Sequence, residues 1–461
     1  MQRSDSPSQV SPATTPRAGG WYKWAVVGML WFVCFFNYAD RQAIAAVLPV
    51  LGEEFAFTKT QQGLIASAFM WVYALSAPLA GGVGDRTSRK MLILGGLYVW
   101  SIVTGFTAAC SKLWHFVLVR GAEGFGETFY FPASMSLVSD YHSKRTRSRA
   151  MSLHQTSVYA GTVGGAWFAG WMTVTTGDWR WPFVVLGAGG VVLGLVLAFF
   201  IREPQRNEAE RLESGELGAS EPDTVHPTIG TSQAAQQGFV AGALATFVDV
   251  MRFGLELAMN PPALLLVLAF CGANFVAFVF ITWMPTFLRE QYDLDLASAG
   301  FAATIYMQAA SMVGAIVGGL LADSWGQRRA GGRSLVQALG LIAGAPFIYW
   351  VGVTPELNTV LIAMTCFGFA KGIYDSNIWA SLYDVVPAES RGKAVGFTNM
   401  IGWIGAGVGA TAFGYVVDRG YTMNQTLSST AVIYVGIAGL LIVASLLAAQ
   451  RAGRGGAAAS R

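Results

Sequence analysis

Apolar residues run through this chain in long blocks separated by short polar and charged turns. Nothing in the blocks shows the short alternation of barrel strands, and a single chain in lipid must satisfy its backbone hydrogen bonds internally. Twelve blocks are long enough for a helix to cross a bilayer; they lie near residues 24–50, 61–84, 91–111, 113–139, 150–175, 181–201, 263–288, 297–322, 334–352, 358–384, 393–416 and 428–449. The pattern therefore predicts an all-α membrane protein with twelve transmembrane helices.

A polar stretch divides the twelve blocks into two groups of six. It runs from Arg202 to about Gly238, is rich in Glu, Gly, Ser and Gln, and cannot bury an apolar core. Residues 239–257 then show helical spacing of apolar positions, which predicts an amphipathic helix on the membrane surface or packed on the cytoplasmic face of the bundle. The predicted organisation is a disordered tail (1–20), an N-terminal six-helix half (21–202), a cytoplasmic linker (203–262), a C-terminal six-helix half (263–450) and a C-terminal tail (451–461).

Internal repeats indicate that the two halves are related. Residues 81–90 read GGVGDRTSRK, and residues 319–328, which lie 238 positions later, read GLLADSWGQR. A second register of 244 positions aligns charged and small residues, pairing Asp140 with Asp384, Arg147 with Arg391, Gly161 with Gly405 and Gly165 with Gly409. Two related halves that meet at a central seam are the architecture of a secondary transporter, in which one half rocks against the other.

Composition and charge agree with a membrane protein. Hydrophobic residues make up 53% of the chain and charged residues 12%, about half the charged share of a soluble domain. On the predicted topology, 22 of the 30 Lys and Arg residues fall on the side that carries both termini and the linker, so that side is the cytoplasmic one. The four cysteines lie inside apolar blocks without metal-binding spacing. We therefore expect no metal, cofactor, nucleic-acid partner or enzymatic activity.

Seven ionisable residues interrupt the apolar spans. A charge at membrane depth costs at least about 2.5 kcal/mol on insertion scales, so such groups face the bundle interior, pair with one another or line an aqueous path. They are Asp40 and Arg41 in the first span, Arg120, Glu123 and Glu127 in the fourth, and Lys371 and Asp375 in the tenth. Under the 244-residue register Glu127 aligns with Lys371, which places a carboxylate and an ammonium group at pseudo-symmetric positions.

Several of these residues lie in recognisable motifs. Residues 81–90 resemble the loop signature of the major facilitator superfamily. Three further segments resemble the anion:cation symporter family within it, namely Asn37-Tyr38-Ala-Asp40-Arg41, Trp71-Val-Tyr73 and Arg120-Gly-x-x-Gly124-x-Gly126-Glu127. That family carries organic anions such as hexuronates, galactonate and tartrate together with protons. The Asp40-Arg41 and Gly126-Glu127 pairs are also similar to those of spinster-type lipid transporters.

The resemblance implies roles for the charged residues. Asp40 and Glu127 would carry the coupling protons, while Arg41 and Arg120 would hold substrate or regulate those carboxylates. From their depth in the spans, Arg120 and Lys371 are predicted to clamp a substrate carboxylate between the halves, with Arg41 mainly tuning Asp40. Neutral polar side chains complete the predicted substrate site: Tyr38, Tyr73, Gln155, Asn377 and Asn399.

Charges at the cytoplasmic helix ends predict a gate. The turns that hold them must separate when a central cavity opens inward, so their ion pairs should act as a latch. The predicted gating residues are Asp85, Arg86, Arg89, Asp140, Asp323 and Arg391.

The sequence thus predicts a proton-coupled transporter of a small organic anion, working by alternating access as a monomer. Its partners would be the anion, protons and the lipid bilayer. It would lie in the inner (plasma) membrane of a bacterium with both termini in the cytoplasm. One alternative is a spinster-like carrier of a lipid or amphiphile, in which aromatic side chains along the cavity would outnumber polar donors. Another is a non-transporting receptor or scaffold, against which the retained buried charges argue.

Overall fold

The computed structural model describes residues 21–84, 87–143, 145–204, 208–209 and 239–459. These residues form helices joined by short turns, in the order α1 (Tyr22–Phe55), α2 (Lys59–Gly84), α3 (Arg89–Thr107), α4 (Leu113–Thr128), α5 (Tyr130–Tyr141), α6 (Arg147–Thr176), α7 (Arg180–Phe200), α10 (Phe239–Ala258), α11 (Pro261–Tyr292), α12 (Leu296–Arg328), α13 (Gly332–Val353), α14 (Leu357–Asp375), α15 (Ile378–Tyr383), η1 (Ala388–Ser390), α16 (Arg391–Asp418) and α17 (Met423–Ala459). The predicted tail 1–20 and most of the polar linker lie outside the described residues, and α17 continues beyond residue 450.

Each predicted span coincides with one helix or with two consecutive helices. Nine of the described segments are long and apolar enough to cross a membrane. The 34-residue α1 and the 30-residue α6 are longer than most of them but carry more polar residues. The fourth span is divided into α4 and α5, and the tenth into α14 and α15. The prediction of an all-α, twelve-span membrane fold is confirmed.

The break in the fourth span has a local cause. Pro132 has no N–H to donate to the carbonyl of Thr128, and its ring crowds that carbonyl. The helix is therefore interrupted at Phe129, where α4 ends and α5 begins. This break leaves Glu127 in the last turn of α4.

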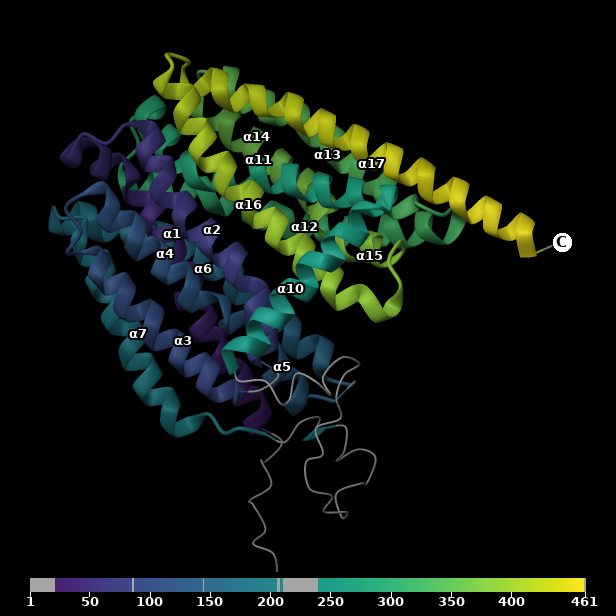
Figure 1. Cartoon of the computed structure of the whole chain (residues 1–461). Helices are drawn as coiled ribbons and strands as arrows, with labels where there is room; N and C mark the ends of the chain where they lie inside the picture. Colours follow the sequence, from purple (N-terminus) through teal and green to yellow (C-terminus); the bar gives the residue numbers. More distant parts are fainter. Residues whose placement is uncertain (1–20, 85–86, 144, 205–207, 210–238, 460–461) are drawn as a thin grey trace, which may run out of the picture.

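The two halves use the same helix pairings. In the N-terminal half α1 packs on α6, α2 on α4 and α3 on α7, and in the C-terminal half α11 packs on α16, α12 on α14 and α13 on α17. Figure 1 shows the first half in purple to blue-green and the second in green to yellow, diverging from a common region at the upper left. The repeat read from the sequence is therefore a repeat of tertiary packing.

Glycines at the aligned positions allow equivalent helices to approach closely. A Cβ atom on Gly165 would lie 2.3 Å from the Cα of Ala39, which brings α6 against α1. A Cβ atom on Gly409, the aligned residue, would lie 2.5 Å from the carbonyl oxygen of Phe275 on α11. Small residues serve this purpose in membrane helix pairs because they let the two backbones come together.

The halves meet mainly along α2 with α16 and along α6 with α12. We call the end of the bundle where α7 stops and α10 starts the linker end, and the other end of the bundle the opposite end. The closest contacts between the halves lie at the opposite end. Cβ atoms on Gly170 and Gly414 would lie 2.3 Å from the Leu296 oxygen and 2.1 Å from the Lys59 oxygen. In this structure the seam is thus closed at the opposite end.

A cross-half helix cap reinforces this closure. Asp418, the last residue of α16, accepts hydrogen bonds from the backbone N–H groups of Lys59 (2.9 Å) and Thr60 (2.8 Å) and from the Thr60 hydroxyl (2.6 Å). These N–H groups belong to the first turn of α2 and have no partner within that helix. A side chain of one half therefore caps a helix of the other.

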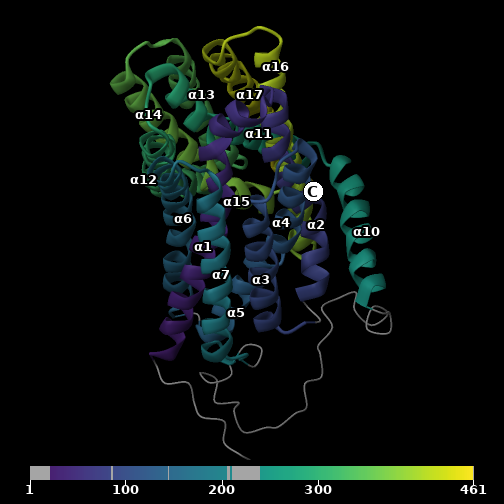
Figure 2. The same cartoon turned by 90° about the vertical axis from the view of Figure 1, so that its left-hand side faces the viewer.

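The linker helix α10 lies along the side of the bundle and contacts both halves, α2 on one side and α16 and α11 on the other (Figures 1 and 2). Phe253 and Leu257 pack into an apolar cluster with the C-terminal half, and Asp249 pairs with Lys393 at 2.6 Å. An exposed apolar stripe that includes Leu244 and Leu255 remains on α10. The helix thus packs on the bundle and still presents an apolar surface.

Candidate functional site

The centre of the site is an ion pair between the two motifs that the sequence analysis singled out. Arg41, midway along α1, donates to Glu127 Oε2 from Nη2 at 2.5 Å and from Nε at 3.1 Å. Arg41 Nη2 also donates to Asn37 Oδ1 at 3.3 Å. The Glu127 side chain is fully buried, whereas 11% of the Arg41 side chain is exposed. Arg41 therefore pairs with Glu127 rather than with the adjacent Asp40.

Four aromatic rings surround the guanidinium group of Arg41. Its Cζ lies over the rings of Tyr38 (4.6 Å to the centroid), Phe69 (4.6 Å), Trp403 (5.2 Å) and Tyr73 (5.3 Å). Three of these rings belong to α1 and α2, but Trp403 comes from α16 in the C-terminal half. We call this arrangement the aromatic cage; it makes Arg41 a residue of the seam, and such cation–π contacts are strengthened where water is excluded.

The other charges of the N-terminal half are enclosed within it. Arg120 donates to Glu123 at 2.5 Å, and both side chains are at most 3% exposed. The Arg120 guanidinium lies 4.9 Å from the centroid of the Phe69 ring, behind the cage. Asp40 is 0% exposed, and its carboxylate accepts no hydrogen bond from the described residues. Arg120 is thus less accessible to a ligand than Arg41, contrary to the clamp geometry predicted from helix depth.

The C-terminal half supplies a second ion pair. Lys371 and Asp375, one turn apart on α14, form a salt bridge with side chains 15% and 36% exposed. Tyr159 of α6, in the other half, lies within electrostatic reach of both charges. The sequence analysis did not single out Tyr159, because one tyrosine in an apolar span carries no local signal of a site.

The predicted neutral donors divide into two groups. Asn377 is buried and donates to the carbonyls of Gly318 (3.1 Å) and Ile373 (3.2 Å), so its amide joins α12 to α14. Gln155 is exposed and Asn399 partly exposed, and neither forms a side-chain hydrogen bond to the described residues. Among the predicted amides, these two remain able to contact a ligand.

Sequence reasoning missed a polar contact between the halves that lies next to Arg41. Gln42 is buried on α1, beside Arg41, and its amide donates to the carbonyl oxygen of Ile281 on α11 at 3.1 Å. A glutamine next to an arginine gave no sign of this, since the contact depends on how α1 is rotated toward the other half. It fixes the position of α1 at the seam.

The predicted gating residues form the same ion pair in each half. Arg89 Nη2 lies 2.9 Å from Asp140 Oδ2, and Arg333 Nη1 lies 2.7 Å from Asp384 Oδ1. Arg333 lies 244 positions after Arg89, and Asp384 lies 244 positions after Asp140, so the second pair repeats the first at the 244-residue register. Arg333 was not predicted, because the motif repeat of 238 residues aligns Arg89 with a glutamine.

The remaining predicted gating residues lie around these pairs. Asp323 is 3.7 Å from Arg333 Nη2, and Arg391 donates to the carbonyl of Tyr383 at 3.4 Å. Asp85 and Arg86 lie outside the described residues. Each of the two repeated pairs joins helices of a single half, so neither pair bridges the seam itself.

The repeated pairs differ in burial, which gives a prediction. Asp140→Asn should lower the stability by about 1.5–3 kcal/mol, because it removes a charged partner from a pair whose side chains are at most 10% exposed. Asp384→Asn should cost only about 0–1 kcal/mol, because that pair is 29% and 41% exposed. Thermal unfolding of both variants in one detergent measures the difference.

If the pairs also act as a gate, both variants should transport more slowly with an unchanged Kd for the anion. An unchanged turnover number in both variants would contradict the gating role.

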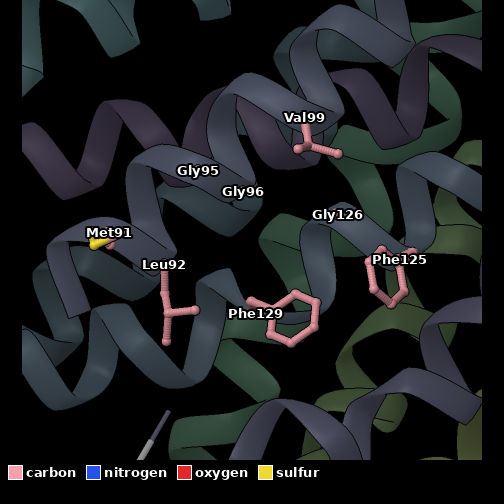
Figure 3. A pocket seen from close by; sticks show the side chains of 8 residues that line it. All are labelled: Met91, Leu92, Gly95, Gly96, Val99, Phe125, Gly126 and Phe129. Carbon is pink, nitrogen blue, oxygen red and sulfur yellow. The ribbon is translucent and has the colours of Figure 1, made fainter. Parts of the chain in front are cut away.

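A pocket elsewhere on the surface is not part of this site. It lies between α3 and α4, where Leu92, Val99 and Phe125 surround a glycine-lined groove (Figure 3). Its lining contains no charged side chain, and Val99 and Phe125 are both 47% exposed. Within the described residues no cluster of His, Cys, Asp and Glu able to hold a metal ion was found.

The comparisons with known proteins agree with this architecture. The family described as Major Facilitator Superfamily matches residues 30–410. The chain belongs to the major facilitator superfamily. It is a multi-pass membrane transporter and not an enzyme.

Relatives within the superfamily include two kinds of transporter. The probable galactarate/D-glucarate transporter GudP of Escherichia coli (strain K12) is 27% identical over 457 residues, which cover 95% of each chain. Protein spinster homolog 1 of Xenopus tropicalis is 27% identical over 379 residues, covering 78% of this chain and 65% of that protein.

The fold is also similar to a solved structure, that of a bacterial homolog to the human lysosomal transporter Spinster in an inward-facing and unoccupied conformation. The TM-score is 0.73 at 21% identity, and the match covers 93% of this chain and 98% of the other. This likeness supports the superfamily architecture of two six-helix halves.

Proposed function

We propose that this protein is a proton-coupled symporter of small organic anions that works by alternating access. Names of several relatives support the anion: besides galactarate/D-glucarate transporters, they include a probable L-galactonate transporter of Escherichia coli (strain K12) and an ascorbate transporter of Arabidopsis thaliana. The observation that carries the proposal is the Arg41–Glu127 pair at the seam.

That pair links proton binding to anion binding. With Glu127 ionised, its carboxylate occupies the N–H groups of Arg41 that a substrate carboxylate would use. Protonation of Glu127 removes the negative charge and weakens the pair, which frees Arg41 for a bidentate contact with the anion. A proton and an anion are therefore bound together, which is the requirement for symport.

The other charged residues have supporting roles in this proposal. Lys371 offers a second cation in the opposing half, so an anion that contacts both Lys371 and Arg41 would draw the halves together. Arg120 lies behind the cage, where it pairs with Glu123 and contacts the Phe69 ring. Asp40, buried beside the main pair, is a second candidate for proton uptake. Tyr38, Tyr73, Gln155 and Asn399 would contact the body of the ligand.

The arrangement of the halves supports alternating access. Among the described residues, hydrogen bonds and ion pairs between the two halves lie in the middle of the bundle or at the opposite end, such as Gln42–Ile281 and Lys59–Glu290. With both termini in the cytoplasm of a bacterium, this state would face inward across the plasma membrane. Gating by the repeated pairs, and a monomeric state, belong to the same proposal.

The test is transport by the purified protein in proteoliposomes. The vesicles have an acidic exterior, and the test anions are sugar acids, aliphatic dicarboxylates and aromatic acids. We expect the internal concentration of at least one of these carboxylates to rise above that of passive equilibration, and the interior to become more acidic as it enters. A protonophore should abolish the accumulation. Accumulation that persists with the protonophore would overturn the coupling, and movement of a lysophospholipid instead of any anion would favour the amphiphile alternative.

A further inference from the structure

The surface around Arg41 is rich in aromatic rings. Beyond the aromatic cage, Phe278 of α11 contacts the Trp403 ring with centroids 5.0 Å apart, and Trp403 lies 4.8 Å from the Tyr73 ring. Phe278, Trp403 and Tyr38 are each partly exposed. Ring faces from both halves are therefore available to whatever reaches the guanidinium group.

Nearby amide groups already form hydrogen bonds within the protein. Asn37 accepts from Arg41, and Asn274 donates to the Phe270 carbonyl of its own helix at 2.8 Å. The Gln42 amide is bonded across the seam, as described above. Beside Arg41, the hydroxyls of Tyr38 and Tyr73 and the indole N–H of Trp403 form no hydrogen bond to the described residues. The amide nitrogen of Asn37 also has no partner there, but it is buried.

This distribution of polar groups disfavours a polyhydroxylated substrate. A sugar acid has a hydroxyl on nearly every carbon, and each one loses hydration when it enters a closed site. Hydroxyls that find no partner there weaken binding, because the site does not replace their hydrogen bonds to water. Three neutral donors among several rings are too few to satisfy such a chain.

We propose that the substrate is a small aromatic carboxylate whose ring stacks on the exposed side of the aromatic cage. The inference rests on the proposed function, since it names the class of anion that Arg41 would hold. A carboxylate attached directly to a ring is coplanar with it, so when the carboxylate meets the N–H edge of Arg41 the ring can lie against the partly exposed side of Trp403, which itself contacts Tyr73 at 4.8 Å. Aromatic pairs in offset or edge-to-face contact stabilise such a complex beyond the area they bury.

The side of the site nearer the linker end can bind a polar substituent on the ring, at a position remote from the carboxylate. Asn399 lies one helical turn from Trp403 on α16, toward the linker end, and Gln155 lies one turn from Tyr159 on α6. Their amides are not bonded to the described side chains or backbone. A hydroxyl or second carboxyl on the ring would meet these groups and the Lys371–Asp375 pair.

Binding titrations with three matched carboxylates test the proposal on the purified wild-type protein. We expect benzoate to bind at least about tenfold more tightly than D-glucarate. Cyclohexanecarboxylate, which has similar size but no flat aromatic face, should bind more weakly than benzoate. The comparison among ligands requires no substitution, so it is independent of how well a variant folds.

Variants of Trp403 then test whether this residue causes the preference for benzoate. Trp403→Phe should keep the benzoate preference, Trp403→Leu should reduce it, and Trp350→Leu, at an exposed position on α13, should leave it unchanged. D-Glucarate binding as tightly as benzoate would overturn this inference and leave the proposed function standing. Binding of neither anion would overturn this inference, and binding of a lysophospholipid only would overturn the proposed function as well.

Discussion

Glu127→Gln is expected to abolish uphill accumulation of the anion while exchange of substrate between two pools continues. Glutamine matches the shape of a protonated glutamate but exchanges no proton, so Arg41 would stay available to the anion throughout the cycle. In proteoliposomes with an acidic exterior, the internal concentration should rise only to that of passive equilibration. Counterflow with unlabelled anion inside the vesicles should proceed at both acidic and neutral pH.

A matched control is Glu256→Gln, the same substitution at an exposed position of the linker helix α10. It should concentrate the anion as the wild type does. If Glu127→Gln also concentrates the anion at the wild-type rate, Glu127 is not the coupling residue. Repeating the measurement with Asp40→Asn would then decide whether that buried carboxyl carries the proton.

Arg41→Gln is expected to weaken anion binding by at least about 2 kcal/mol, which is about 30-fold in Kd. The substitution removes the planar fork that holds the carboxylate, and it also leaves Glu127 buried without its partner. Loss of one member of a buried pair destabilises a protein by about 3–5 kcal/mol. Binding titrations and thermal unfolding of the same preparation separate the two effects.

The double variant Arg41→Gln, Glu127→Gln distinguishes binding from folding. Neither side chain then carries a charge, so much of the lost stability should return, while anion affinity should stay low. Arg41→Lys should show intermediate affinity, because lysine keeps the charge but not the bidentate geometry. Wild-type affinity in the double variant would show that the anion is held elsewhere, with Lys371 the first residue to examine.

Contacts within one helix could be predicted from the sequence, because the helical repeat determines them. Arg120 and Glu123 are three residues apart, and Lys371 and Asp375 four apart, so each pair was expected to share a helix face. The structure shows both as ion pairs. The twelve spans could likewise be read from the length of the apolar blocks.

Contacts between helices at membrane depth could not be predicted, because they depend on how each helix is rotated about its axis. Arg41 stands next to Asp40 in the chain, yet α1 turns its side chain toward Glu127 on α4. Trp403 and Phe69 gave no signal, since an aromatic residue in an apolar span looks the same whether it faces lipid or the seam. Arg333 was missed for another reason. The 238-residue offset of the loop motif hides its equivalence to Arg89, which only the 244-residue offset reveals.

The cap that Asp418 places on α2 has a consequence for the pace of the transport cycle. Opening the opposite end would require this carboxylate to leave the helix terminus, so its three hydrogen bonds add to the barrier between the two orientations of the carrier. Asp418 lies at the end of α16, about four turns from Trp403. Substitutions of this residue would therefore change the lifetime of each orientation of the carrier without changing its substrate selectivity. Transport rate and selectivity can thus evolve independently.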